Sequence, residues 1–592
     1  MVQLTLFPDN APGPRWISPP WTTASDRWLE IDSDLPADHP ARRIAELVAA
    51  LDLSPLVRSY AGLGSPAHPP ELLVRLALFE IHRGCLSPTQ WFEDCRYDDA
   101  VKWLVFGLRP SRSCLYQFRD RIGPFVDLWN RSVLQTAKAE GWTPMKRAAL
   151  DGTFAASYAS RHTPIKAQPL ARRCQQLEAA VAADFADAGR TPPGPASAAE
   201  VAPTAVDLSG RPEALPELAP MAEPTPVPTA EVAPTAEATS PSATVPASPP
   251  TPTENPAWMA TTPAGRFRQW RRYRRAEEVL QGRQEHREAT MSRRSKAKRR
   301  APEQIKVSLT DPEAPLGLDK TKVFRPLFNV QFACDLDSRF ILGYGAFAAA
   351  NDANLLGPTL ERARQLTGTT PEVVLNDDSY ANILNLKLCD EQKVTMYAPP
   401  PKAPSLPGVP GSTPIGAGGC GGEASGPAPR APRITKSDFT WLPESQTYRC
   451  PEGHSLFLER RGVQRRTDGE LVESQYRCPP EHCRACPLAG RCTRSPEQGR
   501  IVKRSEHDDL QDALRQRMSR PDSQAIYRLR KQTVERQFAD VKQHRGLRQF
   551  ASFGLERARI QVGLVVLAHN GLELLKARSQ ATDEATPSRQ VG

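Results

Sequence analysis

The stretch Lys531–Phe550, KQTVERQFADVKQHRGLRQF, combines an apolar stripe with a high density of basic residues. Its apolar residues follow the i, i+4, i+7 spacing of one helical face, which predicts an amphipathic helix built on Val534, Phe538 and Val541. Glu535 falls on the shoulder of this face, with Lys531 and Lys542 beside it. A solvated helix with i,i+4 Lys–Glu pairs is one explanation of this glutamate, and a specific functional role is the other.

The whole chain is long, basic and rich in proline, with 592 residues, a formal charge of +10 and 59 prolines. This length exceeds one ordinary domain, and the proline content together with only 39% hydrophobic residues predicts that part of the chain does not fold. The positive charge favours a polyanionic partner such as nucleic acid, although positive charge also serves solubility.

The sequence predicts a cytoplasmic protein with no membrane-spanning segment. The N-terminal MVQLTLFPDNAPGPRW lacks the charged start and apolar core of a secretory signal, and the longest apolar run, Ile560–Ala568, is too short to cross a bilayer. Thiols stay reduced in the cytoplasm, so clustered cysteines indicate metal binding rather than disulfides.

Residues 36–146 are predicted to form a helical N-terminal domain, because apolar residues recur at helical spacing in Ala41–Asp52 and Pro70–Gly84. Within this domain Ser111–Arg121 has the features of a DNA-recognition helix, with a capping serine and the basic residues Arg112 and Arg119. A plain surface helix explains the same pattern.

The middle of the chain changes composition. Residues 168–262 are predicted to be a disordered insertion, because stretches such as Ala233–Pro256 are rich in Pro, Ala, Thr and Ser and have no apolar periodicity. A basic helical arm is predicted over residues 263–304. Its aromatics alternate with arginines, which suits phosphate contact and base stacking by Phe267, Trp270 and Tyr273, or simply a solvated arm.

A mixed α/β region is predicted from residues 147–167, 305–400 and 505–576. Apolar, β-prone runs occur at Arg147–Leu150, at Leu327–Phe347 around a polar DLDSR turn, at Pro371–Tyr380 and at Lys393–Pro400, and a helix is expected over Asn354–Gly368. Residues 401–500 are predicted to be a loop followed by a small cysteine-rich insertion, and the helices that carry Glu535 come last.

Three acids lie at the ends or edges of these predicted elements. Asp151 and Asp377 each end a strand-like run, and Glu535 lies at the edge of a helix. Ligands of α/β folds gather at the carboxyl ends of strands, so carboxylates far apart in the sequence can converge there. Converging carboxylates favour Mg²⁺ or Mn²⁺, and two such ions support in-line phosphoryl displacement. Physical reasoning alone does not select these three acids from 67.

A family resemblance does select them. The chain resembles bacterial insertion-sequence transposases of the Asp-Asp-Glu class, which have a helical N-terminal domain and a ribonuclease-H-like catalytic core. The resemblance rests on LDGTFAASYAS around Asp151, TDPEA at Thr310–Ala314, FNVQFACD at Phe328–Asp335, VVLNDDSY around Asp377 and YRLRKQTVERQFADVKQHRGLRQF at Tyr527–Phe550. LPADHPARRI, HPPELLVRLALFEIHRGCLSPTQWFEDC and PSRSCLYQFR resemble the N-terminal domain.

The resemblance implies that Asp151, Asp377 and Glu535 bind two Mg²⁺ or Mn²⁺ ions. It also implies DNA contacts from basic and tyrosine residues of the last catalytic helix, namely Tyr527, Arg530, Lys531 and Lys542, with Arg530 and Lys531 as alternatives for one phosphate contact. Two positions depart from the family pattern: Ser379 replaces a usual glycine beside the competing ligand Asp378, and Phe553 replaces a usual arginine.

Five cysteines lie within Tyr448–Cys492. Cys483 and Cys486 form a CxxC pair, and together with Cys450 and Cys492 they predict a tetrahedral structural zinc. Cys478, His454 and His482 are alternative ligands. Reduced free thiols and an iron–sulfur cluster are the competing interpretations.

The predicted function is therefore transposition, in which the enzyme cleaves DNA and transfers strands at the ends of its own insertion sequence. Double-stranded DNA is the expected partner, a homodimer or higher oligomer is the expected assembly, and the bacterial nucleoid is the expected location. Two alternatives remain: a catalytically inactive DNA-binding derivative, and a metal-dependent nuclease without strand transfer.

Overall fold

The computed structural model describes residues 13–60, 62, 64–189, 256–291, 301–400, 433–466 and 469–585. These residues form two compact units, one within residues 169–275 and the other from residues 13–168 and 276–592. The predicted loop from 401 to 432 and most of the predicted Pro/Ala-rich insertion lie outside the described residues.

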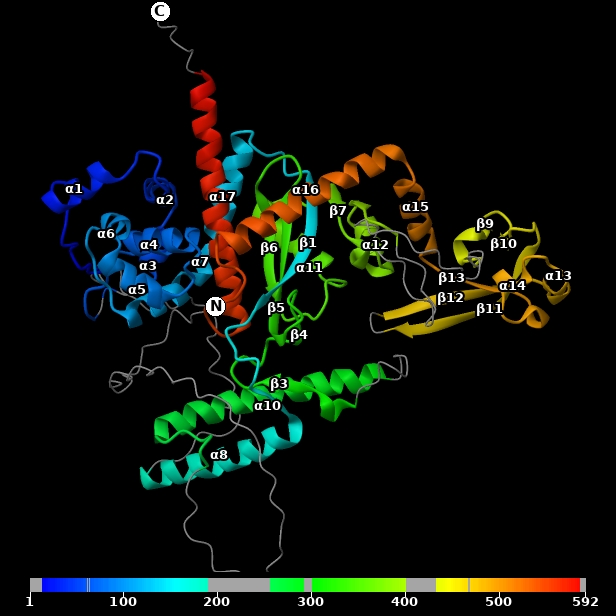
Figure 1. The fold of residues 1–592 in the computed structure, drawn as a ribbon, viewed down its shortest axis with the longest axis horizontal. Helices are drawn as coiled ribbons and strands as arrows, with labels where there is room; N and C mark the ends of the chain where they lie inside the picture. Colours follow the sequence, from blue (N-terminus) through cyan, green and yellow to red (C-terminus); the bar gives the residue numbers. More distant parts are fainter. Residues whose placement is uncertain are drawn as a thin grey trace, which may run out of the picture. The chain divides into compact units, whose positions relative to one another are not determined.

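The larger unit contains a six-stranded mixed sheet (Figure 1). Its central strand, β1 (Arg147–Ala156), pairs antiparallel with β5 (Phe324–Asp335) and parallel with β7 (Val373–Leu375). The sheet continues from β5 to β4 (Leu316–Leu318) and β6 (Ile341–Phe347), and from β7 to β8 (Thr395–Tyr397). The expected hairpin around the DLDSR turn is confirmed as β5 and β6. A separate pair is formed by β2 (Pro164–Lys166) and β3 (Lys306–Ser308).

The register of β1 determines where the predicted acids lie. Ala149 pairs with Leu375, so Asp151 and Asp377 each follow two residues after the same rung of the parallel pair. The expectation that Asp151 ends its strand is wrong. The strand continues to Ala156, because β5 supplies hydrogen-bond partners along its whole length.

The N-terminal region is helical, as predicted. Its helices are α1 (Asp26–Asp34), α2 (Pro40–Ala49), α3 (Ser54–Arg58), α4 (Pro70–His82), α5 (Pro88–Tyr97), α6 (Asp99–Leu104) and α7 (Arg112–Ala139). Ser111 caps α7 as expected, since its hydroxyl accepts from the Cys114 amide at 3.2 Å.

The remaining helices of the larger unit are α11 (Leu356–Thr367), α12 (Ile383–Glu391), α15 (Asp508–Met518), α16 (Pro521–Gln543) and α17 (Leu555–Ala585). One hydrophobic core includes buried residues of the N-terminal helices, the sheet and α17. Buried amides tie these parts together: Asn130 of α7 donates to the Gly563 carbonyl of α17 at 3.0 Å, and Asn570 of α17 donates to the Ile341 carbonyl at 2.9 Å.

The smaller unit corrects two expectations about residues 168–304. Helix α8 (Ala167–Asp187) occupies the start of the predicted disordered insertion, and it packs beside α10 (Pro263–Met291). Arg266 pairs with Asp184, and Phe267 contacts Phe185 at a ring-centroid distance of 5.6 Å. The aromatics predicted to stack on bases are instead internal, since Trp270 and Tyr273 are buried. Their alternation with arginines follows from a helix with one buried apolar face.

The predicted cysteine-rich insertion contains more regular structure than expected. Residues 440–505 form a five-stranded antiparallel sheet in the order β13-β12-β11-β10-β9. The strands are β9 (Thr440–Leu442), β10 (Thr447–Arg449), β11 (Ser455–Arg466), β12 (Gly469–Arg477) and β13 (Ile501–Ser505), with short helices α13 (Pro480–Arg484) and α14 (Ala489–Cys492) between the last two. An Asp-Gly turn signal at 468–469, between two long β-prone runs, could have revealed the central hairpin.

Among the described residues, no helix is both long enough and apolar enough to cross a membrane.

Candidate active site

Asp151 is partly buried and paired with a cation from α16. Its Oδ2 accepts from the Arg530 guanidinium at 2.7 Å, and its Oδ1 accepts from the Gly152 amide at 2.8 Å. Burial raises the pKa of Asp151 above its ordinary value, and Asp377 and Asp352 raise this pKa further, while Arg530 lowers it. Three carboxylates therefore influence one another at this point of the sheet.

Asp377 lies two residues after the end of β7. Its Oδ1 accepts from the Ser379 amide at 2.9 Å and from the Ser379 hydroxyl at 2.6 Å, so the serine that replaces the usual glycine orients this carboxylate. Asp378 is exposed. Burial raises the pKa of Tyr527, as do the negative charges of Asp377, Asp378 and Asp151, which places the Tyr527 side chain beside the acids.

Asp352 is an acid of this site that sequence reasoning did not identify. It lies in the loop after β6, where its Oδ1 accepts from Asn329 at 2.7 Å and from Gln331 at 2.8 Å. Gln331 in turn accepts from the Tyr380 hydroxyl at 2.6 Å. The sequence signal was weak: polar Asn329 and Gln331 alternate within the apolar run FNVQFACD, and both are fully buried.

Glu535 is exposed on α16 and has no hydrogen bond or ion pair to another described residue. Its neighbour Val534 belongs to a small buried cluster with Ala149 and Leu375, the residues two positions before Asp151 and Asp377. The helix therefore carries Glu535 over β1, which contains Asp151, and over β7, which Asp377 follows. In the described chain the ligand atoms of the three predicted acids do not all lie within 4.8 Å of one another.

Lys542, near the C-terminal end of α16, contacts β1, the strand that carries Asp151. Its ammonium donates to the Thr153 hydroxyl and contacts the Phe154 carbonyl oxygen at 3.4 Å. Burial lowers the pKa of Lys542 to about 8, and the positive charges of Lys320 and Arg548 contribute to this shift. Lys320 and Arg548 are exposed, so with Lys542 they form a group of basic residues that sequence reasoning missed.

The other predicted DNA contacts differ in exposure. Arg530 faces Asp151, whereas Lys531 is exposed and free to meet a ligand. Arg112 is exposed at the start of α7 and lies 3.4 Å from Glu93. Arg119 is only 3% exposed and pairs with Asp120 at 2.8 Å, so its burial counts against a DNA contact in this conformation.

The TDPEA motif has a structural role here. Asp311 is buried and accepts from the Ser157 hydroxyl, at the end of β1. Glu313 accepts from the Leu555 amide at 2.8 Å and so caps the N-terminus of α17. The motif thus connects the catalytic strand to the last helix.

The cysteine patch converges on one small pocket. Its lining includes all five cysteines and both histidines expected there, namely Cys450, Cys478, Cys483, Cys486, Cys492, His454 and His482. Backbone amides donate to two of the sulfurs: His454 to Cys450 at 3.3 Å, and Arg500 to Cys483 at 3.4 Å. Such N–H···S contacts stabilise thiolate ligands. Burial and the neighbouring thiols together raise the pKa of Cys478 to about 12.

Comparison with known protein families gives two matches. A family described as "Transposase DDE domain" matches residues 449–575, and a family described as "Transposase domain (DUF772)" matches residues 29–121. The first match includes Glu535, Lys542 and the cysteine patch, while Asp151 and Asp377 lie between the two matched segments. Comparisons with curated proteins and with solved structures gave no match.

Proposed function

We propose that this chain, which belongs to the insertion-sequence transposases of the Asp-Asp-Glu class, uses Asp151, Asp377 and Glu535 to cleave and rejoin DNA at the ends of its own mobile element. One observation carries the assignment of these acids. The parallel pairing of β1 with β7 brings Asp151 beside Asp377, and Val534 packs on both strands with Glu535 next to it. The mixed sheet is compatible with the ribonuclease-H-like core that the family resemblance implies.

The donor set fits two Mg²⁺ or Mn²⁺ ions, because the negative charges of Asp377 and Asp352 raise the pKa of Asp151, and a hard cation would stabilise such neighbouring carboxylates. When bound, the ions activate the attacking oxygen and stabilise the leaving oxygen of the phosphodiester. The protein's own residues would hold the DNA. Lys542, Lys320 and Arg548 form a group of positive charges, with Lys542 at Thr153 of the strand that carries Asp151, and Tyr527 and Lys531 lie on the same helix as Glu535.

Arg530 would balance the negative charge of Asp151. It holds this carboxylate in place in the absence of cations and keeps its negative charge compensated. A bound cation would take over this compensation and free the guanidinium for a DNA phosphate, which suits the bidentate geometry of arginine.

The cysteine patch would hold a structural zinc through Cys450, Cys483, Cys486 and Cys492. Its support is the common pocket, with amide donors on the sulfurs of Cys450 and Cys483. Such an ion would stabilise the small sheet from which the chain enters α15 and α16. A homodimer or larger assembly on double-stranded DNA is part of the same proposal, because two element ends must be joined, and the site of action would be the bacterial nucleoid.

The test is excision and reintegration in cells. A marker is placed between the DNA segments that flank the gene, and wild type is compared with Glu535→Gln, which removes one negative charge and keeps the shape of the side chain. We expect excision in wild type and a loss of at least about 100-fold in the variant, since a metal ligand is lost. Glu391→Gln is the matched control, because Glu391 is also an exposed helical glutamate.

Excision that survives in Glu535→Gln would contradict the assignment of the third acid. Absence of excision in wild type, with intact binding of the flanking DNA, would favour a DNA-binding derivative without catalysis. Two observations give that second candidate weight: Asp151 is paired with Arg530, and the ligand atoms of the three acids do not all lie within 4.8 Å of one another. Cleavage without rejoining in a purified reaction would favour a nuclease.

A further inference from the structure

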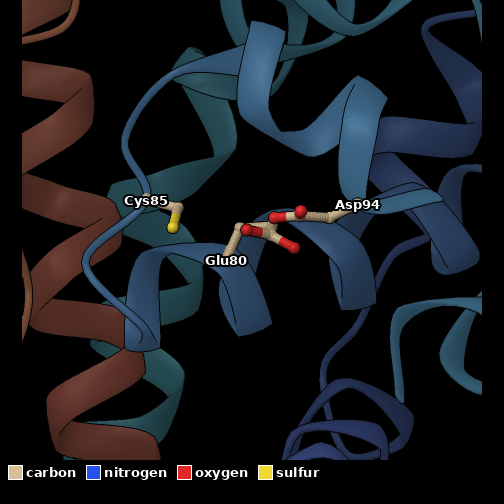
Figure 2. A group of neighbouring side chains, drawn as sticks. All are labelled: Glu80, Cys85 and Asp94. Atoms are coloured by element: carbon tan, nitrogen blue, oxygen red, sulfur yellow. The ribbon is translucent and has the colours of Figure 1, made fainter. Parts of the chain in front are cut away.

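A second group of metal-binding residues lies in the N-terminal helices, away from the acids of the sheet. Glu80 belongs to α4, Cys85 to the turn that follows it, and Asp94 to α5. Their ligand atoms all lie within 4.8 Å of one another, the only such group of three in the described part of the chain. Figure 2 shows the carboxylates of Glu80 and Asp94 facing each other, with Glu80 between Asp94 and the sulfur of Cys85.

The carboxylate of Glu80 is completely buried among the described residues. The residue is 0% exposed, and neither Oε1 nor Oε2 accepts a hydrogen bond from a donor in the part of the chain that the structure describes. Asp94 is 8% exposed; its Oδ1 accepts from Gln90 at 2.9 Å, and its Oδ2 has no donor within the same part of the chain. Buried carboxylate oxygens without donors are costly, so this arrangement requires a proton or a cation to compensate it.

The charges around Glu80 and Asp94 also favour a proton or a cation at this group. Arg83 faces the group, but its guanidinium lies 3.9 Å from Glu80 and 3.8 Å from Asp94, and its short contact, at 2.7 Å, is with Asp98. One guanidinium is therefore shared among three carboxylates. In the absence of a further cation, burial raises the pKa of Glu80 to about 8 and that of Cys85 to about 11.

We propose that Glu80, Cys85 and Asp94 bind a divalent transition-metal ion of the zinc class, at a site distinct from the catalytic acids and from the cysteine patch. A thiolate together with two carboxylates suits zinc better than the all-oxygen environment preferred by Mg²⁺. Three protein ligands leave a fourth position for water. On binding, the thiol releases its proton to solvent, and the resulting thiolate becomes a ligand.

An ion at this site would also affect how the neighbouring segment packs. The turn between Glu80 and Cys85 contacts the segment that follows α16: the Nδ1 atom of His82 lies 3.0 Å from Arg545, and a side chain on Gly546 would meet the Gly84 carbonyl oxygen at 2.3 Å. An ion that ties this turn to α5 would therefore also fix the surface on which the C-terminal end of α16 rests. This inference does not depend on the chain being an active transposase.

The test measures thiol protection by zinc in the full-length protein. The protein is treated with a chelator, divided into samples with and without added zinc, and alkylated, and each cysteine-containing peptide is quantified by mass spectrometry. We expect zinc to slow alkylation of Cys85 at least about 10-fold. Cys114 is the internal control, because it is also half-buried and is not a member of the group, so its alkylation rate should not change. Equal rates for Cys85 with and without zinc would overturn the proposal.

Two variants separate metal binding from proton sharing. Cys85→Ala and Glu80→Gln should each lower the zinc content by about one equivalent per chain relative to wild type, whereas Cys114→Ala should not. If Cys85→Ala fails to fold, Glu80→Gln carries the comparison, since an amide replaces the carboxylate at nearly equal volume. A Glu80→Gln protein with unchanged zinc content and a higher melting temperature would show that the acids share a proton instead, and would refute the site.

Discussion

At the scale of single residues, the groups that form the candidate site are so tightly packed that an added atom would clash. Gly152 follows Asp151, and a β-carbon at this position would lie 2.1 Å from Gln331 Nε2 and 2.3 Å from Asp352 Oδ1. The glycine is therefore required by the close approach of the Asp352 network to the strand. This close approach explains why a glycine follows Asp151 in the DGT sequence.

Gly152→Ala should consequently displace Asp352 and Gln331 and disturb the orientation of Asp151. We expect a destabilisation of about 1–3 kcal/mol and a larger loss of excision than the stability change explains. Thermal unfolding and the excision assay measure the two effects. Gly282→Ala is the control, because a β-carbon there would meet nothing within 4 Å. Full activity in Gly152→Ala would show that the network does not position Asp151.

Lys542 allows a prediction about pH. Its pKa is lowered to about 8 by burial, so the free protein loses this positive charge as the pH rises through that value. DNA binding should therefore weaken between about pH 7 and pH 9, because a neutral amine no longer attracts phosphate. Fluorescence anisotropy with flanking DNA at fixed salt measures this change.

Lys542→Gln should bind DNA more weakly at pH 7, lose the pH dependence, and lower the salt-dependence slope by about one. Lys387→Gln, on α12, is the matched control because Lys387 is a helical lysine paired with Glu391. An unchanged pH profile in Lys542→Gln would assign the titration to another group.

At the scale of elements, α16 is held between the sheet and the last helix by a buried polar junction. Asp540 accepts from Arg545 at 2.9 Å, and His569 of α17 lies 3.2 Å from the same oxygen. Burial by itself raises the pKa of Asp540, but the hydrogen bond from His569 and the charge of Arg545 outweigh it and leave this pKa well below its usual value. This junction ties α16 to α17 close to the C-terminal end of α16.

Asp540→Asn should lower the stability of the folded protein by about 2 kcal/mol at pH 7. A carboxyl with a depressed folded pKa stabilises above its unfolded pKa of about 3.9, and this contribution is lost as the pH falls toward the folded pKa. The difference in melting temperature between wild type and variant should therefore be largest near pH 7 and shrink below about pH 4. Asp390→Asn, an exposed helical aspartate, should show no such difference. A difference that persists at acid pH would contradict the ionic contribution of Asp540.

At the scale of the whole molecule, a long segment interrupts the strands of the mixed sheet. β1 and β5 are neighbours in the sheet, yet residues 157–323 separate them in the sequence. Within this segment lie α8 and α10, which are joined by the Arg266–Asp184 pair and by aromatic packing. The helices supply their own contacts, and the Pro/Ala-rich composition of residues 190–255 offers little apolar surface to bury.

Replacing residues 190–255 with a short Gly/Ser linker should therefore leave the melting temperature unchanged within about 2 °C and preserve DNA cleavage. A longer deletion, of residues 175–255, removes Asp184 and Phe185 and should lower the melting temperature of the smaller unit. Calorimetry of both variants measures the difference. A large loss of stability in the shorter deletion would show that the replaced segment contributes to folding.

The sequence by itself determined which elements form where the local signal was strong. The stripe of Val534, Phe538 and Val541 specified α16, and the DLDSR turn between two β-prone runs specified the β5–β6 hairpin, because helix and turn formation depend on neighbouring residues. It was wrong where packing partners lie far away in the chain. The ten-residue extent of β1, the helix α8 and the burial of Trp270 and Tyr273 all depend on such partners.

Only the tertiary structure decided which side chains meet. Sequence reasoning named Asp151, Asp377 and Glu535 with the help of a family resemblance, but it could not reveal Asp352, the Arg530–Asp151 pair or the Glu80–Cys85–Asp94 group. The physical reason is that register, chain crossing and burial set these distances. β1 and β7 are neighbours although residues 157–372 separate them in the sequence, and no local pattern determines which residues pair across the two strands.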